Sequence, residues 1–298
     1  MMDVTRSGIV ALVGVPNVGK STLLNKLVGE KVGIISPKAN TTRLVVRGVV
    51  TQGSAQIVFV DTPGLNTSTK AFDRMLVQQA QGALADADLV MLVIEARKGL
   101  DGRTREIMDL CRKMAKPTVL VLNKVDMVQP RSKLLPLMQQ VADTGAFIEV
   151  FAIDAVRGKG VDDIVPRLAK RLPEGPWFFP PDTVTDVPVA MRLAELTREK
   201  AMLFLQQELP YGLTVLPKEM GEDEKGLMVV QQDILVSAER HKGMVVGQKG
   251  AMLQRIGSAA RADIQEVLGR PVYLDLSVRV EARWQEKLNL LQELGLGR

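Results

Sequence analysis

The sequence contains one cysteine, one histidine and no apolar run long enough to cross a membrane. Cys111 has no partner for an intrachain disulfide, which fits a reducing cytosol, and we expect it to be a small core residue of a helix. Because His241 stands alone, metal clusters built from several imidazoles are excluded. No signal peptide, internal repeat or low-complexity tract is recognised. These absences favour a cytoplasmic protein with packed domains.

The length and the charge balance indicate two domains and a polyanionic partner. At about 100–200 residues per domain, a chain of 298 residues suits two domains. Hydrophobic residues make up 46% of the chain, which is enough for real cores. The net charge is +5 and the pI is about 9.3. A basic balance of this kind fits a polyanion such as a nucleic acid.

The first motif is a glycine-rich run between an expected strand and an expected helix. Residues 8–13 are apolar and predict a buried strand, and the leucines of residues 22–28 share one face of a helix. The run between them fits the P-loop pattern G-x-x-x-x-G-K-S, whose backbone N–H groups cradle phosphates at a helix N-terminus. Lys20 is expected to reach the terminal phosphates, and Ser21 to bind Mg²⁺. The predicted phosphate-binding residues are Gly14, Val15, Pro16, Asn17, Val18, Gly19, Lys20, Ser21 and Thr22.

The second motif, Asp61-Thr62-Pro63-Gly64, follows the apolar run of residues 55–60. A carboxylate at the end of such a strand matches the role of holding Mg²⁺. These residue types also favour a surface turn, but the P-loop upstream favours the metal site. Gly64 then offers a backbone N–H to the terminal phosphate with no Cβ in the way.

The third motif, residues 123–126, follows a buried strand over 117–122. Ligands bind at that edge of an open parallel sheet. Asp126 presents two acceptor oxygens, which match N1–H and the 2-amino group of guanine; polar mismatch with adenine can discriminate by roughly 10⁴ or more. Lys124 can lay its stem over the base, and Asn123 can tie this loop to the P-loop. The three motifs together specify GTP and predict a GTPase domain.

A fourth base contact is expected after the strand over 147–151. The backbone N–H of Ala155 can meet guanine O6. Asp154 precedes it, where GTPases of this type usually carry serine, so a carboxylate stands at an unexpected place. Its effect on GTP binding is left open.

Residues 34–43 contain proline and small polar residues and predict a switch loop. Thr41 or Thr42 is expected to complete the Mg²⁺ shell, and the register favours Thr42; alternatively both only begin a strand over 44–50. Leu65 follows Gly64 and has no polar atom to orient an attacking water. Asn17 leaves two alternatives open: it holds K⁺ near the phosphates, as asparagine at this place can in GTPases, or it only braces the loop.

The remainder of the chain predicts a smaller α+β domain with the order α-β-β-α-α-β. A helix is expected over 188–209, strands over 213–216, 227–238 and 271–280, and two helices on either side of Gly247-Gln248-Lys249-Gly250. This order, with G-x-x-G between adjacent helices, is the KH arrangement of the prokaryotic type. Two glycines let the backbone of single-stranded nucleic acid approach closely.

Basic residues gather around that turn. Residues 239–261 hold five Lys/Arg and one acidic residue, on a chain whose net charge is only +5. A G-x-x-G run alone is usually just a turn, but here the flanking pattern favours RNA binding. The predicted RNA-binding residues are Gly247, Gln248, Lys249, Gly250, Lys242 and Arg255.

These residues together resemble the Era family, bacterial GTPases of small ribosomal subunit assembly. The resemblance covers nearly the whole chain and includes the motifs of residues 16–22, 41–43, 61–64 and 123–126, and the later motifs at 246–250, 256–257 and 271–275. The last three separate Era from other small GTPases. Departures are Asp154 and Leu44.

The resemblance implies a GTP-hydrolysing switch that binds the 3′ end of 16S rRNA and acts on the 30S subunit, as a cytoplasmic monomer with Mg²⁺ as cofactor. Some family members associate with membranes, which leaves a peripheral membrane contact open. The alternative is an RNA-binding protein whose GTP domain is structural and does not hydrolyse. A double-domain GTPase is excluded because there is no second P-loop.

The expected fold class is therefore α/β, a P-loop GTPase domain with a mostly parallel sheet followed by an α+β KH domain. We expect the GTPase domain over residues 1–172, a proline-rich linker over 173–187, the KH domain over 188–280 and a C-terminal tail over 281–298. The aromatic residues of the linker are expected to pack between the domains.

Overall fold

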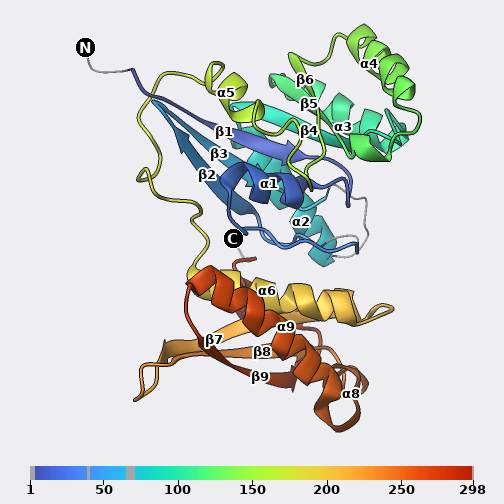
Figure 1. Cartoon of the computed structure of the whole chain (residues 1–298). Helices are drawn as coiled ribbons and strands as arrows, with labels where there is room; N and C mark the ends of the chain where they lie inside the picture. Colours follow the sequence, from blue (N-terminus) through green and yellow to red (C-terminus); the bar gives the residue numbers. More distant parts are fainter. Residues whose placement is uncertain (1–3, 39–40, 65–70, 297–298) are drawn as a thin grey trace. The chain divides into compact units, whose positions relative to one another are not determined.

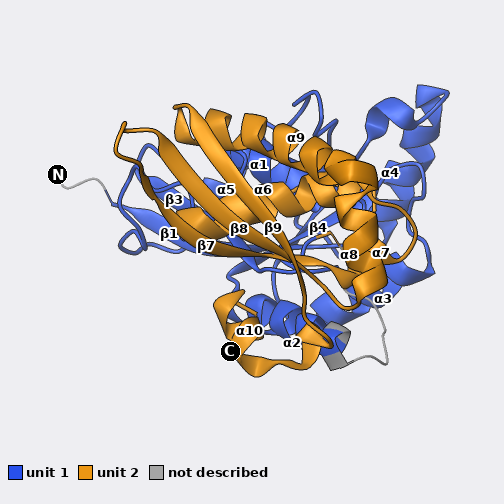
Figure 2. Cartoon of the chain, turned by 90° about the horizontal axis from the view of Figure 1, so that it is seen from below, with its two compact units in different colours: residues 1–33, 42–186 blue, residues 34–41, 187–298 orange. Residues whose placement is uncertain are grey.

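The computed structural model of this chain describes residues 4–38, 41–64 and 71–296, and these form two compact units (Figure 1). Unit 1 comprises residues 1–33 and 42–186, and unit 2 comprises residues 34–41 and 187–298 (Figure 2). Each unit has its own sheet and its own buried core.

Unit 1 contains a six-stranded sheet in the order β2-β3-β1-β4-β5-β6. All neighbours are parallel except β2 and β3, which are antiparallel. The predicted mostly parallel sheet is therefore confirmed. Its strands are β1 (Arg6–Val13), β2 (Val46–Gln52), β3 (Ala55–Asp61), β4 (Leu89–Glu95), β5 (Thr118–Asn123) and β6 (Glu149–Ala152).

Helices cover both faces of this sheet, and for that reason its central strands are buried at every position and mostly apolar. One face packs against α2 (Ala71–Asp86), α3 (Gly102–Lys113) and α4 (Leu134–Asp143). The other packs against α1 (Lys20–Val28) and α5 (Ile164–Ala169). Cys111 of α3 is buried in the core, as expected.

Unit 2 contains a three-stranded sheet with helices on one face (Figure 2). β8 lies in the middle, antiparallel to β7 and parallel to β9. Its order is the predicted α-β-β-α-α-β, with short additional helices. The elements are α6 (Val189–Phe204), α7 (Leu209–Gly212), β7 (Thr214–Glu222), β8 (Met228–Val236), α8 (Glu239–Val246), the 3₁₀ turn η3 (Gln248–Gly250), α9 (Ala251–Leu268) and β9 (Val272–Val280).

The expected linker is part of unit 1 up to residue 186. It adds extended segments beside the sheet: Arg6 pairs with Glu174, and Gly48 with Thr185. Trp177 donates from its indole N–H to the carbonyl of Ser54 at 3.2 Å. This hydrogen bond gives the polar end of the indole a partner within unit 1.

The described part of the expected C-terminal tail, residues 281–296, is folded. It contains the 3₁₀ turn η4 (Trp284–Glu286) and α10 (Leu288–Glu293). Trp284 is fully buried and donates to the carbonyl of Gly212 at 2.9 Å. These residues belong to unit 2, and the buried Trp284 anchors them there.

Residues 34–41 of the expected switch belong to unit 2. The backbone N–H of Ile35 donates to the Glu199 carboxylate at 2.8 Å, and the Lys38 ammonium binds carbonyls at the C-terminal end of α6. Arg198 donates to the carbonyl of Thr41 at 2.6 Å. Sequence patterns did not indicate these contacts, since each joins residues more than 150 positions apart.

Candidate functional site

The P-loop joins the end of β1 to the start of α1, in the strand–turn–helix context that the motif requires. Lys20 is 7% exposed, and its ammonium donates to the carbonyls of Gly14 and Val15, at 3.0 and 3.3 Å. It is thus held over the loop whose N–H groups cradle phosphates. Gly64 packs on the same loop, where a Cβ would lie 2.9 Å from Pro16.

Three oxygen-bearing side chains meet beside the P-loop. Ser21 Oγ donates to Asp61 Oδ2 at 2.5 Å and lies 3.0 Å from Thr42 Oγ1. Asp61 is fully buried, yet its Oδ1 has no hydrogen-bond partner among the described residues. A buried carboxylate oxygen without a donor is costly unless a cation or water binds it. A hydroxyl and carboxylate set of this kind fits Mg²⁺, which prefers oxygen ligands.

Burial has the largest effect on the pKa values of Lys20 and Asp61. It lowers the pKa of Lys20, and Asp61 only partly opposes this. It raises the pKa of Asp61, against the opposing effects of Lys20 and of the Ser21 and Thr42 hydroxyls. Both groups are buried at the cost of desolvation, which phosphate oxygens at Lys20 and a cation at Asp61 would offset.

The two switch threonines point to different partners. Thr42 Oγ1 lies with Ser21 and Asp61, whereas Thr41 Oγ1 donates to the carbonyl of Lys38 within unit 2. The geometry therefore agrees with the choice of Thr42 for the metal shell. The other second-motif residues are ordered: Thr62 donates to the Leu12 carbonyl at 2.9 Å, and Pro63 is buried. Leu65 lies outside the described residues.

Asn123 organises the base-binding loop at the end of β5. Its Nδ2 donates to the carbonyl of Val18 in the P-loop at 2.7 Å, which confirms the expected tie between the loops. Its Oδ1 accepts from the backbone N–H of Lys124 and of Ala155, at 2.8 and 3.0 Å. The backbone N–H of Ala155, which was expected to meet guanine O6, therefore donates to Asn123 in this structure.

Lys124 is held at both ends. Its φ of 61° is the left-handed conformation, and its ammonium donates to the Asn17 carbonyl at 2.7 Å and pairs with Glu95 Oε2 at 3.2 Å. Glu95, the last residue of β4, was missed by sequence reasoning. Only its place at the end of a buried strand could have suggested it. The stem of Lys124 is thereby fixed where a base can stack.

Asp126 and the loop after β6 meet through one side chain. Arg157 Nη1 lies 3.4 Å from Asp126 Oδ2 and 3.1 Å from Asp154 Oδ2. Asp154 is buried, and its pKa is lowered, first by the backbone N–H of Arg157. The unexpected carboxylate is therefore paired.

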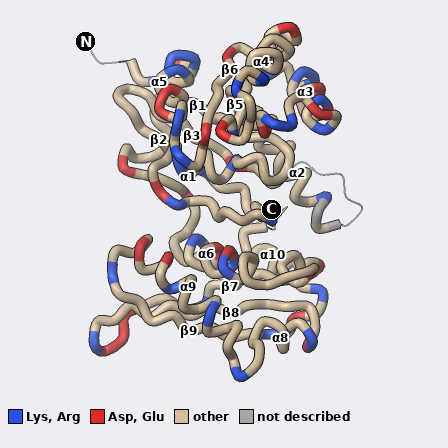
Figure 3. The backbone as a smooth tube through the Cα atoms, turned by 45° about the vertical axis from the view of Figure 1, so that its right-hand side comes forward, with Lys and Arg blue, Asp and Glu red and all other residues tan. Residues whose placement is uncertain are grey.

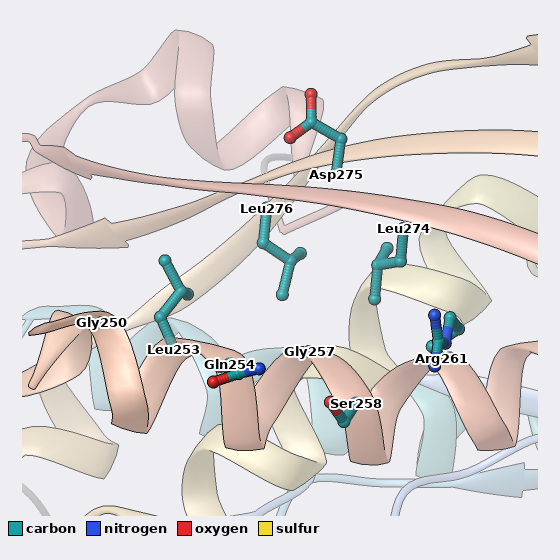
Figure 4. A pocket seen from close by; sticks show the side chains of 9 residues that line it. All are labelled: Gly250, Leu253, Gln254, Gly257, Ser258, Arg261, Leu274, Asp275 and Leu276. Carbon is teal, nitrogen blue, oxygen red and sulfur yellow. The ribbon is translucent and has the colours of Figure 1, made fainter.

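Unit 2 contains a groove of about 380 Å³ between α9 and β9 (Figure 4). The side chains of Leu253, Leu274 and Leu276 point into it, and Gln254 and Ser258 lie along the helix (Figure 4). The groove begins at Gly250 of the G-x-x-G turn. An apolar floor with a polar rim suits unpaired bases. The lining is completed by Gly257, Arg261 and Asp275.

The G-x-x-G turn is built from left-handed backbone. Gly247 has φ +73°, and a Cβ there would lie 2.9 Å from the backbone N of Met252. Gly250 has φ +82°, with open space where a Cβ would be. Gln248 and Lys249 between them are exposed. The second glycine thus leaves room for a backbone to approach, whereas the first is required by the turn itself.

Two of the other predicted RNA-binding residues lie outside the groove lining. The guanidinium of Arg255 lies 4.2 Å from the ring centroid of Phe204, a cation–π contact. Lys242 is half-buried on α8. The groove residues of β9 and the distal part of α9 were missed, because nothing in the sequence shows which strand faces α9. Unit 2 carries both basic and acidic residues (Figure 3), and residues 239–261 are its predominantly basic stretch.

Among the residues that the structure describes, no helix is long and apolar enough to cross a membrane.

Two segments of the chain match known protein families. Residues 9–124 match a family described as a 50S ribosome-binding GTPase, and residues 208–285 match the KH domain. Over 292 residues the chain is 44% identical to the GTPase Era of Rhizobium meliloti, covering 98% of this chain and 93% of that one. It is 41% identical over 296 residues to the GTPase Era of Trichlorobacter lovleyi, covering 99% of each.

Two solved structures resemble the whole chain. One is an Era variant from Aquifex aeolicus bound to GDP·AlF4⁻, and the other is Era in complex with MgGDPNP and nucleotides 1506–1542 of 16S ribosomal RNA. Each has a TM-score of 0.93 and 38% sequence identity, and covers 99% of this chain and 100% of its own.

Proposed function

Because the chain belongs to the Era family of GTPases, we propose that it acts in small ribosomal subunit assembly and binds the 3′ end of 16S rRNA through the KH domain of unit 2. The chain is a GTPase with a KH domain. The observation that carries the proposal is the groove between α9 and β9, which opens at Gly250 of the G-x-x-G turn. We expect it to act as a cytoplasmic monomer.

The GTP site supplies positioning and charge, which account for most catalysis in phosphoryl transfer. Lys20 would bind the terminal phosphate oxygens, and Ser21, Thr42 and Asp61 would hold Mg²⁺. The metal would neutralise charge on the phosphates. Lys124 and Asp126 would hold guanine, so that the phosphates stay in register with Lys20.

If the chain hydrolyses GTP at this site, removal of the Lys20 ammonium should stop hydrolysis. Lys20→Ala removes the cation from the phosphate site and should abolish GTP turnover, while binding of RNA to unit 2 should stay unchanged. Single-turnover hydrolysis and RNA titration on the same protein measure both. Turnover that persists in Lys20→Ala would contradict the phosphate-site assignment, and absence of turnover in the unmodified chain would favour the structural, non-hydrolysing alternative.

We also propose that Asn17 holds K⁺ near the phosphates. Its φ of 65° places it at the turn of the P-loop, with its carbonyl bound by Lys124. Exchange of Na⁺ for K⁺ at constant ionic strength should raise the hydrolysis rate, and Asn17→Ala should remove the response. Equal rates in the two salts would contradict this role.

The proposal that RNA binds in the groove is tested with two variants that introduce the same negative charge at different places on α9. The probe is an RNA with nucleotides 1506–1542 of 16S rRNA, the fragment in the similar Era complex. Ser258→Asp places a negative charge on the exposed rim of the groove and should weaken binding by about tenfold or more. Ala262→Asp adds the same charge one turn further along α9, outside the lining, and should have a much smaller effect. Equal RNA affinity in the two variants would mean that the RNA site lies outside this groove.

Lys249 adds a second measurement. It is exposed in the turn, and Lys249→Ala should lower the slope of log affinity against log salt by about 0.7, the share of one contact to a single strand. Lys225→Ala, in the turn between β7 and β8, is the control that should leave the slope unchanged.

A further inference from the structure

The loop after β6 carries a carboxylate that the GTP site does not by itself explain. Asp154 is 3% exposed and belongs to a tight loop, closed by two reciprocal backbone hydrogen bonds between Asp154 and Lys159, of 3.0 and 3.1 Å. Asp154 Oδ1 accepts from the backbone N–H of Arg157 at 3.1 Å, and Oδ2 from its Nη1 at 3.1 Å. The carboxylate thus fixes both the backbone and the side chain of Arg157.

The same guanidinium nitrogen reaches the base-reading residue. Arg157 Nη1 lies 3.4 Å from Asp126 Oδ2. One nitrogen therefore bridges two carboxylates that come from different loops. The two carboxylate oxygens can be no farther apart than the two contact distances added together. At such a separation two negative charges repel appreciably near a protein surface.

The charges of Asp126, Asp154 and Arg157 together set the net charge that faces guanine. Two carboxylates and one guanidinium leave a net charge of −1, which is what a single carboxylate facing the donors of guanine would carry alone. Asp154 has only 4% of its side chain exposed, so solvent cannot replace the cation effectively. Loss of the guanidinium would leave the buried Asp154 carboxylate with backbone N–H donors and no cation beside it, and its repulsion of the Asp126 carboxylate would no longer be cancelled.

We propose that Arg157 is a positioning residue for guanine recognition: it holds the Asp126 carboxylate in place and cancels the charge of Asp154. Arg157 acts through Asp126, because its contacts are to carboxylates. Each carboxylate oxygen accepts more than one hydrogen bond, so Asp126 can accept from Arg157 and from the base together. The inference rests on the proposed contact between Asp126 and guanine.

The test is a set of GDP affinities, measured by titration of the full chain with a fluorescent GDP analogue. Arg157→Ala should weaken binding by about tenfold, the scale expected when a buried charge loses its partner. The double variant Asp154→Ser with Arg157→Ala removes the repelling carboxylate as well and should recover most of that loss. Arg103→Ala, an exposed arginine of α3, is the control and should bind like the unmodified chain.

A second readout separates positioning from a general loss of structure. Inosine diphosphate lacks the 2-amino group, so the ratio of GDP to inosine diphosphate affinity reports how well Asp126 meets that group. Arg157→Ala should lower this ratio, and Arg157→Lys, which keeps a cation, should restore part of it. A general loss of structure would weaken both nucleotides equally.

Three results would overturn the inference: unchanged or tighter GDP binding in Arg157→Ala, no recovery in the double variant, or an unchanged nucleotide ratio. Tighter binding would mean that Arg157 competes with guanine for Asp126. Asp126→Asn distinguishes a failure of the premise. If that variant keeps full GDP preference, the base assignment itself is wrong; if it loses the preference while Arg157→Ala does not, only the role of Arg157 fails.

Discussion

Replacement of Arg198 by methionine should destabilise unit 2 more than replacement of any exposed arginine. Arg198 on α6 has no exposed side-chain surface. Its Nη2 donates to the carbonyl of Thr41 at 2.6 Å and to Glu195 Oε2 at 2.6 Å, and its Nε donates to Glu195 Oε1 at 2.7 Å. Methionine keeps a similar volume of side chain and removes every one of these donors.

The size of the destabilisation follows from the polar groups that lose their donor when Arg198 is replaced. The carbonyl of Thr41 lies in a residue only 9% exposed, and a buried acceptor without a donor costs about 1–3 kcal/mol. Glu195 is 17% exposed, so water replaces part of its lost pairing and the larger penalty for a broken buried pair applies only in part. We expect a total of about 3 kcal/mol, or roughly 10 °C in Tm for a domain of this size.

Tryptophan fluorescence allows this transition to be followed alone. Trp284 is fully buried in unit 2, and Trp177 belongs to unit 1, so Trp177→Phe leaves a single reporter. Thermal and urea unfolding of Trp177→Phe with and without Arg198→Met give the difference. Arg261→Met, an exposed arginine of α9, is the control. A loss below about 1 kcal/mol would refute the reasoning, because it would mean that the unpaired groups reach water.

Three further outcomes are expected. Asp126→Asn should lower GTP affinity by a factor on the order of 10³–10⁴ and raise that for xanthosine triphosphate, measured by titration; unchanged affinities would contradict the base assignment. Burial alone would raise the pKa of Asp233, but the Ser277 hydroxyl and Arg279 together lower it. The ionised carboxylate therefore stabilises the fold fully at a pH above the pKa of Asp233 in the unfolded chain, and this stabilisation is lost as the pH falls through its pKa in the folded chain. Asp233→Asn should therefore flatten the loss of stability between about pH 5 and pH 2 in urea unfolding, and an unchanged slope would count against the pair. Burial raises the pKa of Cys111 to about 11, so a thiol reagent at pH 8 should react with the native chain roughly a hundredfold or more slower than with the unfolded one; comparable rates would show the thiol to be accessible.

Local spacing was enough to predict the GTP site. The expected strand over residues 8–13 corresponds to β1 (Arg6–Val13), and the expected helix after the P-loop corresponds to α1. The second and third motifs end β3 and β5, two strands of one parallel sheet. The carboxyl ends of parallel strands meet at one edge, so motifs far apart in the chain meet there as well. The sequence determined these contacts because each depends on a strand end and a fixed local offset.

The KH domain was predicted as an order of elements, and its groove was not. The sequence shows Gly247 and Gly250, but which strand faces α9 depends on the pairing of β9 with β8. Leu274 and Leu276 alternate with Asp275 along that strand, and only the packing on α9 shows which side of the strand lines the groove.

Long-range polar contacts were decided by the tertiary structure alone. Arg198 meets the switch at Thr41, and Arg157 meets Asp126, through side chains that bridge separate segments. A repeating pattern of apolar residues reports which face of an element is buried, but it carries no information about which distant polar group will satisfy a buried charge. That choice is made when the segments pack, because a charge removed from water is stable only beside a partner of matching geometry.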